Sequence, residues 1–168
     1  MQKNFEERMM PTVDEVYQWL EEVKDPEIPV LSIVDLGIIT EIKISEDNIQ
    51  VEMTPTFVGC PAIDMMKQEV ALAIKQRGID RVSVLITFKN PWSSDKISEK
   101  GKAALKQFGL APPPPSSYIS DIHLLENVPC PRCDSTHTEM RSPFGSTLCR
   151  SIHYCVECKE SFEQFKPI

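Results

Sequence analysis

Residues 38 to 53, IITEIKISEDNIQVEM, contain two runs in which hydrophobic and polar side chains alternate. Ile42 and Ile44 end the first run, and the second covers residues 49 to 53. A period of two is typical of strands that bury one face. Four polar residues, 45 to 48, separate the runs, which is a common length for a hairpin turn. The stretch therefore predicts a β-hairpin.

Helical spacing occurs on both sides of this hairpin. Before it, a capping box from Thr12 to Glu15 predicts the start of a helix over residues 13 to 24. Pro26 ends that helix because proline disfavours helical geometry in the preceding residue. After the hairpin, residues 62 to 77 predict a second helix, with Gly78 as its C-terminal stop.

A further strand is expected over residues 82 to 88, and a last helix over residues 95 to 107, begun by Ser93 or Ser94 and stopped at Gly109. A strand, a helix and a strand in succession make a right-handed crossover, so the last strand should lie parallel to a hairpin strand. Residues 1 to 110 thus predict an α/β (α+β) domain of order α-β-β-α-β-α, with helices packed on a mixed sheet.

The remaining residues divide into a spacer and a small second unit. Residues 111 to 120 contain four consecutive prolines, which favour a stiff, extended linker. Residues 121 to 168 include three segments with strand character and hold five of the six cysteines. We expect a small β zinc-ribbon domain there.

Four cysteines of this second unit form two C-x2-C pairs, Cys130 with Cys133 and Cys155 with Cys158. Each pair can bring two thiolates to one ion, and four sulfurs complete a tetrahedral shell for structural zinc. Iron suits the same four-thiolate geometry and remains the alternative. A closed shell leaves no open position for a substrate, so the predicted metal is structural.

Cys149 is a fifth thiol close to the second pair in sequence. It could exchange with a ligand, bind a second metal or be a buried spectator, and free cysteine is among the most buried residue types. The three histidines are not needed as ligands because the four-cysteine set is complete.

Cys60 lies in TFVGCPA, residues 56 to 62, between the predicted second strand and second helix. We expect Cys60 at the helix N-cap and Pro61 at the first helical position, where the helix dipole favours the thiolate. The thiol is thus a candidate metal ligand or reactive group, or an inert packing residue. Residues 1 to 111 contain no histidine, which excludes a Cys-His catalytic pair within the domain.

Three carboxylates, Asp25, Glu27 and Asp35, lie in a proline-containing segment before the hairpin. They could be oxygen ligands beside Cys60, and they are equally suited to forming turns.

The net charge is -7, and neither residues 1 to 111 nor residues 112 to 168 carry a basic excess. Nucleic-acid binding is therefore not expected. The N-terminus is too polar for a signal peptide, and no apolar run approaches the roughly 20 residues that span a membrane. We expect a cytoplasmic protein, whose cysteines are ligands or reactive thiols rather than disulfides. The oligomeric state stays open.

The segments DPEIPVLSIVDLG (25 to 37), TPTFVGCPA (54 to 62) and NPW (90 to 92) resemble the metal-sulfur cluster assembly factor family. Together with the cysteine-rich residues 130 to 168, nearly the whole chain resembles the family of D subunits of bacterial phenylacetyl-CoA ring epoxidase systems. Those systems contain a di-iron oxygenase component and a flavin and iron-sulfur reductase.

The resemblance implies an accessory protein of phenylacetate breakdown that assists iron or iron-sulfur cluster assembly in the oxygenase or reductase subunits. It makes Cys60 the candidate for transient iron or cluster handling, with Asp25, Glu27 and Asp35 as helpers, and it matches Cys149 to a family cysteine. A structural adaptor within the epoxidase complex is the alternative. The chain has no E-x-x-H pair and no G-x-G-x-x-G fingerprint, which agrees with a role that is not catalytic.

Overall fold

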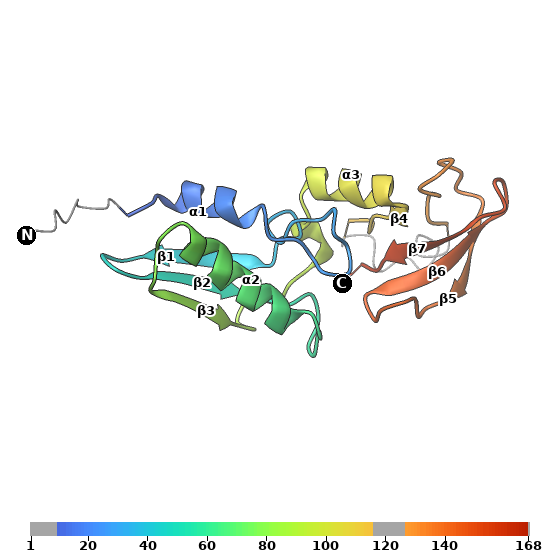
Figure 1. Cartoon of the computed structure of the whole chain (residues 1–168). Coiled ribbons are helices and arrows are strands. Elements are labelled where there is room, and N and C mark those ends of the chain that lie inside the picture. Colours follow the sequence, from blue (N-terminus) through green and yellow to red (C-terminus); the bar gives the residue numbers. More distant parts are fainter. Residues whose placement is uncertain (1–9, 116–126, 168) are drawn as a thin grey trace, which may run out of the picture.

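The computed structural model describes residues 10 to 115 and 127 to 167. It forms an elongated molecule with one β-sheet towards each end (Figure 1). The elements in chain order are α1 (Val13–Leu20), β1 (Ile39–Ile44), β2 (Ile49–Met53), α2 (Ile63–Gln76), β3 (Val82–Ile86), the 3-10 turn η1 (Ser94–Lys96), α3 (Glu99–Phe108), β4 (Leu110–Ala111), β5 (Thr138–Ser142), β6 (Arg150–Cys155) and β7 (Ser161–Phe165). The predicted order of helices and strands is confirmed.

The N-terminal sheet has the order β1-β2-β3. β1 and β2 form the predicted antiparallel hairpin, and β3 pairs parallel with β2, as expected for a strand that follows a crossover helix. Ile42, Val51 and Val84 are buried beneath the helices. The other face is polar, with Lys43 Nζ 3.6 Å from a carboxylate oxygen of Glu52. The sheet therefore buries one face only.

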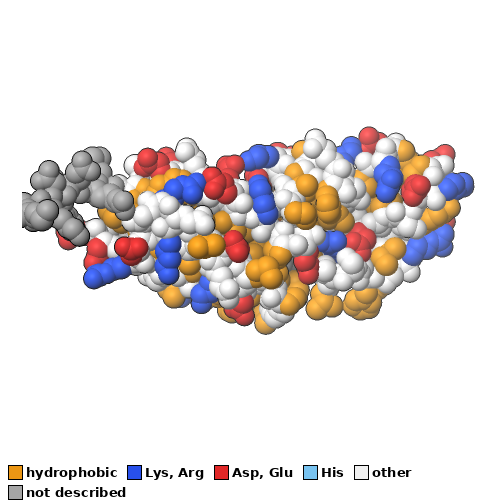
Figure 2. Space-filling view, in the orientation of Figure 1, with side chains coloured by type: hydrophobic (Ala, Val, Ile, Leu, Met, Phe, Trp, Pro, Cys, Tyr) orange, Lys and Arg blue, Asp and Glu red, His pale blue; other side chains and the backbone are white. Residues whose placement is uncertain are grey.

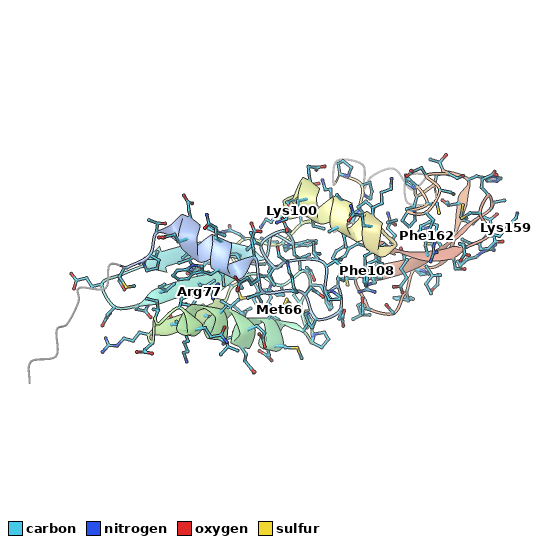
Figure 3. All side chains as sticks on the ribbon, turned by 45° about the horizontal axis from the view of Figure 1, so that its top comes forward. Met66, Arg77, Lys100, Phe108, Lys159 and Phe162 are labelled. Atoms are coloured by element: carbon cyan, nitrogen blue, oxygen red, sulfur yellow. The ribbon has the colours of Figure 1, made fainter. Side chains whose placement is uncertain are left out.

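The helices α1 and α2 cover this sheet, and α1 is shorter than predicted. The Thr12–Glu15 capping box is present, but α1 ends at Leu20, earlier than expected. The Val23 N–H still donates to the Leu20 carbonyl at 3.2 Å in a turn, but the Val23 carbonyl accepts a hydrogen bond from the Ile33 N–H, so the helix does not continue beyond this turn. At the end of α2, Arg77 (labelled in Figure 3) donates to Glu22 at 2.7 Å and ties the end of α2 to the turn that follows α1.

The last helix begins later than the sequence predicts. Ser98, rather than Ser93 or Ser94, is the N-cap of α3, and its hydroxyl accepts a hydrogen bond from the Gly101 N–H. The residues before it form the short η1 turn. Gly109 stops the helix as predicted, with a φ of 93° that favours glycine.

The C-terminal sheet has the order β4-β7-β6-β5, and its three longer strands coincide with the segments of predicted strand character. β4 follows α3 directly and pairs with β7. The predicted boundary between residues 110 and 111 therefore falls inside a two-residue strand. Residues 112 to 115 have no helix or strand, and residues 116 to 126 of the predicted linker and second domain lie outside the described residues.

One hydrophobic core joins the two parts of the chain. Phe165 and Cys149 of the C-terminal part belong to the same buried cluster as the residues under α1 and α2. Trp92 connects them, since its indole N–H donates to the Leu36 carbonyl at 2.9 Å and its ring lies 5.9 Å from that of Phe165. A smaller cluster surrounds the buried Cys130 and Cys155 sulfurs.

In the described part of the chain, no helix has the length and hydrophobicity required to cross a bilayer. On the face displayed in Figure 2, Lys and Arg side chains are interspersed with Asp and Glu. Because the two signs are mixed, that face has no continuous basic surface.

Candidate functional site

The four predicted metal ligands lie together. The sulfurs of Cys130, Cys133, Cys155 and Cys158 all lie within 4.8 Å of one another. The Cys130 and Cys158 sulfurs are 3.7 Å apart, and those of Cys133 and Cys155 are 3.5 Å apart. Four sulfurs at about 2.3 Å from a tetrahedral zinc are separated by about 3.8 Å. The residues therefore fit a four-thiolate metal ion, and this is a metal-binding site.

Two turns of the same shape hold these sulfurs. In each turn the carbonyl of the first cysteine accepts a hydrogen bond at 3.0 Å from the residue four positions later, Asp134 or Lys159. Both of these residues have a left-handed φ, 60° and 62° respectively. Backbone N–H groups of Cys158 and Glu157, together with the neighbouring thiols, lower the pKa of the Cys155 thiol to about 7. Burial and the same crowding of thiols raise the pKa of Cys158 to about 12 and also raise that of Cys133. Without a cation the four thiols therefore cannot all ionise easily, and a bound metal would stabilise the thiolates that it requires.

The histidines of the described residues do not join this site. His137 is exposed and lies 3.2 Å from Glu157. His153 is fully buried, stacks on Phe162 of β7 (labelled in Figure 3), and has Nε2 3.0 Å from the Ser151 hydroxyl. His123 lies outside the described residues.

Cys60 lies in the loop between β2 and α2, half-buried. Gly59 precedes it with a φ of 85°, a conformation that glycine adopts without strain. The N-cap of α2 is Ala62, so the prediction that Cys60 is the N-cap is wrong. Burial raises the pKa of the Cys60 thiol, and Asp25 and Glu27 act in the same direction, whereas a hydrogen bond from the Ala62 backbone opposes them. The expected preference for the thiolate is wrong as well.

Cys60 faces a cavity of about 230 Å³ between the two parts of the chain. Three segments line it: the loop after α1, the loop before α2, and the segment that leads into β6, with Phe165 from β7. The lining residues are Asp25, Glu27, Ile28, Thr56, Phe57, Cys60, Pro61, Ala62, Ser146, Thr147, Leu148, Cys149 and Phe165.

The structure brings two of the three candidate carboxylates to this cavity. Asp25 caps the turn that contains them, because its Oδ1 accepts hydrogen bonds from the N–H groups of Glu27 and Ile28 at 2.8 and 2.9 Å. Glu27 is exposed. Both residues line the cavity together with Cys60.

Asp35 does not line the cavity. Its carboxylate accepts hydrogen bonds from the hydroxyls of Ser32 at 2.8 Å and Ser98 at 2.6 Å, and it lies 3.4 Å from Lys100 of α3 (Figure 3). Burial on its own would raise the pKa of Asp35, but these hydrogen bonds and the Lys100 charge together lower it below its ordinary value. Asp35 thus fastens the start of α3 to the segment before β1.

Cys149 lies in the cavity wall rather than in the four-cysteine site. It is 8% exposed, and its carbonyl accepts a hydrogen bond from the Lys166 N–H at 2.9 Å. The Thr147 hydroxyl lies 3.1 Å from its sulfur. Burial raises the pKa of the Cys149 thiol. The two thiols outside the four-cysteine site therefore line one cavity.

Sequence reasoning missed Arg150, which holds the cavity walls together. Its guanidinium donates to the Glu27 carbonyl at 3.1 Å, to Glu163 at 3.0 Å and to the Ser146 hydroxyl at 3.2 Å. The side chain is 7% exposed. An arginine next to a cysteine carries no local signal of this role, because its partners lie on three separate segments.

The chain is similar to proteins of known families over both of its parts. A family model described as an iron-sulfur cluster assembly protein matches residues 13–86, and one described as a PaaD zinc beta ribbon domain matches residues 117–166. A solved structure of a domain of unknown function, DUF59, from Bacillus anthracis matches with a TM-score of 0.52 and 29% identity, over 55% of this chain and 89% of that chain.

Two relatives extend this likeness. The Fe-S protein maturation auxiliary factor of Porphyromonas gingivalis is 33% identical over 57% of this chain and 92% of its own length. A protein of Escherichia coli (strain K12), provisionally named as the D component of 1,2-phenylacetyl-CoA epoxidase, is 35% identical over 94% of both chains. Because this likeness covers the α/β part and the ribbon together, the chain belongs to the family of phenylacetyl-CoA epoxidase D components.

Proposed function

We propose that this protein is an accessory factor that hands iron, as an ion or as an iron-sulfur cluster, to the oxygenase or reductase subunits of a phenylacetyl-CoA epoxidase system. Cys60 is the thiol that carries this cargo. The reaction of the epoxidase takes place on those other subunits, and this chain contributes binding and transfer.

The observation that carries the proposal is the position of Cys60. Its thiol is half-buried in the wall of a cavity of about 230 Å³, beside Asp25 and Glu27. Thiolate and carboxylate are ligand types that iron accepts. Without a cation, burial and the two carboxylates raise the pKa of the thiol, whereas a bound cation would stabilise the thiolate. The site thus favours a thiol that ionises when its metal arrives.

The names of the relatives support the same assignment. Two of them, from Porphyromonas gingivalis and Bacillus subtilis, are named Fe-S protein maturation auxiliary factors, and their likeness covers about half of this chain. The relative that also shares the ribbon is named as a component of an epoxidase. A maturation domain joined to a ribbon is the arrangement expected of a factor dedicated to one enzyme system.

In this proposal the four-cysteine site holds zinc and does not take part in transfer. Cys130, Cys133, Cys155 and Cys158 would supply all four ligands, which leaves no position for an incoming group. A bound zinc ion compensates for the small hydrophobic core around Cys130 and Cys155.

The test is the iron content per polypeptide of the oxygenase and reductase subunits, purified from cells that grow on another carbon source while these subunits are expressed. The cells carry the wild-type gene, the Cys60→Ser gene or no gene for this protein. We expect iron-poor subunits in the last two, with Cys60→Ser protein present at the wild-type level. A Thr56→Ala variant changes another residue of the cavity wall and serves as the matched control.

Iron-replete subunits in cells that lack the protein would refute the proposed function. Full function of Cys60→Ser, with loss of function only when the whole protein is absent, would instead favour a structural adaptor in which Cys60 is a packing residue.

A further inference from the structure

We propose that Cys149, supplied by the ribbon, is the second sulfur ligand of the Cys60 cavity, so that the cargo is bound between the two parts of the chain. This inference rests on the proposed function and extends it, because it names the partner thiol and gives the ribbon a part in the site.

Two cysteines from distant parts of the sequence meet at one cavity. Cys60 comes from the loop before α2 and Cys149 from the segment that leads into β6, yet both line the same cavity of about 230 Å³. Besides burial, the charges of Asp25 and Glu27 raise the pKa of both thiols, so the two cysteines share the same carboxylate neighbours. Thiolate ligands of this kind suit soft metal ions and iron-sulfur clusters.

The charged and titratable side chains around the cavity favour a cation. The titratable side chains that line the cavity are two thiols and two carboxylates, and among the described lining residues none is Lys or Arg. The charge of the nearby Arg150 acts on Cys149 and opposes the effect of burial on the pKa of that thiol, but the Arg150 guanidinium is bonded to Glu163, Ser146 and the Glu27 carbonyl. The cavity therefore favours a cationic guest and disfavours an anion. Sulfur donors favour a thiophilic metal, and the proposed function makes that metal iron.

Hydrogen bonds fix the backbone around Cys149. The Cys149 carbonyl is bonded to the Lys166 N–H at the end of β7, and the Gly145 N–H is bonded to the Arg150 carbonyl at 2.9 Å. A Cβ on Gly145 would lie 2.9 Å from the Arg150 Cβ, so the loop closes tightly at this glycine. The ribbon thus fixes the Cys149 backbone while Arg150 fastens the ribbon to the loop of Glu27.

The cavity does not hold a preformed metal shell. Among the described residues, the group of three or more donors placed to hold one ion is the four-cysteine set of the ribbon, and no three donors of the cavity form such a group. An incomplete shell suits a guest that brings its own bridging ligands or that leaves again.

The experiment uses the full chain with zinc already in the ribbon, kept free of oxygen. One arm receives Fe²⁺ alone and the other receives equal amounts of Fe²⁺ and Fe³⁺ with sulfide, which together supply the oxidation states of a cluster, and iron, sulfide and zinc per chain are measured after desalting. The proteins are wild type, Cys60→Ser, Cys149→Ser, Cys149→Ala and Val58→Ala. Val58 is a matched control, because it lies in the same loop as Cys60 but outside the residues that line the cavity, is 82% exposed and offers no donor atom.

We expect Cys60→Ser and both Cys149 variants to lose iron affinity by at least about tenfold, since even changes beyond the ligands cost a metal site 10- to 100-fold. Zinc should stay at one per chain in every variant, and Val58→Ala should bind iron like wild type. Iron held in the first arm identifies a single ion as the guest. Iron held only with sulfide identifies a cluster, and either result supports the inference.

Wild-type iron binding by both Cys149 variants, together with loss in Cys60→Ser, would overturn the inference and leave the proposed function intact. Wild-type binding by all three cysteine variants would overturn both. The Cys149→Ala variant keeps the outcome decisive if serine disturbs this buried position, because alanine introduces no polar atom there.

Discussion

The chain has two sets of cysteines that differ in how complete a metal shell they form. In the ribbon, four sulfurs lie within 4.8 Å of one another on two rigid turns, so a metal finds all of its ligands in place. In the cavity, Cys60 and Cys149 face a space of about 230 Å³ with two carboxylates nearby. The difference teaches that the same side chain serves to retain a metal or to pass one on, according to how many partners surround it.

The largest expected effect is the loss of a ribbon ligand. Cys155→Ser should abolish tight metal binding and unfold the ribbon, because the metal supplies folding free energy on the order of 10 kcal/mol in comparable zinc modules. Metal content per chain and near-UV circular dichroism measure this. Cys149→Ser is the control, since it should keep the ribbon metal. A Cys155→Ser protein with a full complement of metal would refute the difference between the two sets.

The buried contact of Trp92 with Phe165 and Leu36 is the joint between the two parts of the chain, and a substitution there should have the next largest effect, which is on stability. Trp92→Ala removes a buried ring that packs on Phe165 and donates to the Leu36 carbonyl. The free energy of unfolding should fall by about 3–5 kcal/mol, measured by urea denaturation. Phe88→Ala, at a side chain that is 55% exposed, should change it by less than about 0.5 kcal/mol. Equal effects of the two variants would show that the joint is not part of the core.

Asp35 was a candidate helper of Cys60, but it lies outside the cavity and should affect stability rather than metal binding. Its pKa is lowered in the folded protein, so it stabilises the fold above its ordinary pKa, and this contribution disappears as the pH falls below about 4. Asp35→Asn should lower the free energy of unfolding at pH 7 by about 1–3 kcal/mol and reduce its loss in acid.

Iron binding provides the check on this assignment. Asp35→Asn should bind iron in the cavity as wild type does, in the same desalting measurement that is used for the cysteine variants. A variant of full stability that has lost its iron would place Asp35 in the site after all.

The smallest expected effect concerns the reactivity of Cys60. Because its pKa is raised, alkylation by iodoacetamide should be slow at pH 7 and still increase above pH 9. Glu27→Gln removes a like charge and should raise the rate at pH 8 by less than about threefold, and added salt should diminish the difference. Peptide mass spectrometry of the zinc-loaded protein follows Cys60 alone. A rate that is already maximal at pH 7 would contradict the burial of this thiol.

Local patterns explain what could be predicted from the sequence. The hairpin follows from alternation over residues 38 to 53, and the ribbon site from two C-x2-C pairs, because each feature is specified within a short segment. The joint position of Cys60 and Cys149 depends on how the two parts pack, which no local spacing encodes. Arg150 escaped notice for the same reason.

Errors at the helix starts have a related origin. Several residues near each start are suitable caps, and tertiary contacts choose among them. Ser98 caps α3 while its hydroxyl also donates to Asp35, so the cap and a long-range contact are fixed together. Cys60 lies two residues before the N-cap of α2, and its burial outweighs the helix dipole that was expected to favour its thiolate.

The most direct test of the two-site account is the rate at which each metal leaves one and the same molecule. Full-length protein that carries zinc in the ribbon and iron in the cavity is mixed with a chelator, and the release of both metals is followed over time. The account predicts that iron leaves within minutes while zinc stays for hours, and that Cys60→Ser loses only the iron phase. Release of both metals at one rate, or an iron phase that is unchanged in Cys60→Ser, would contradict it.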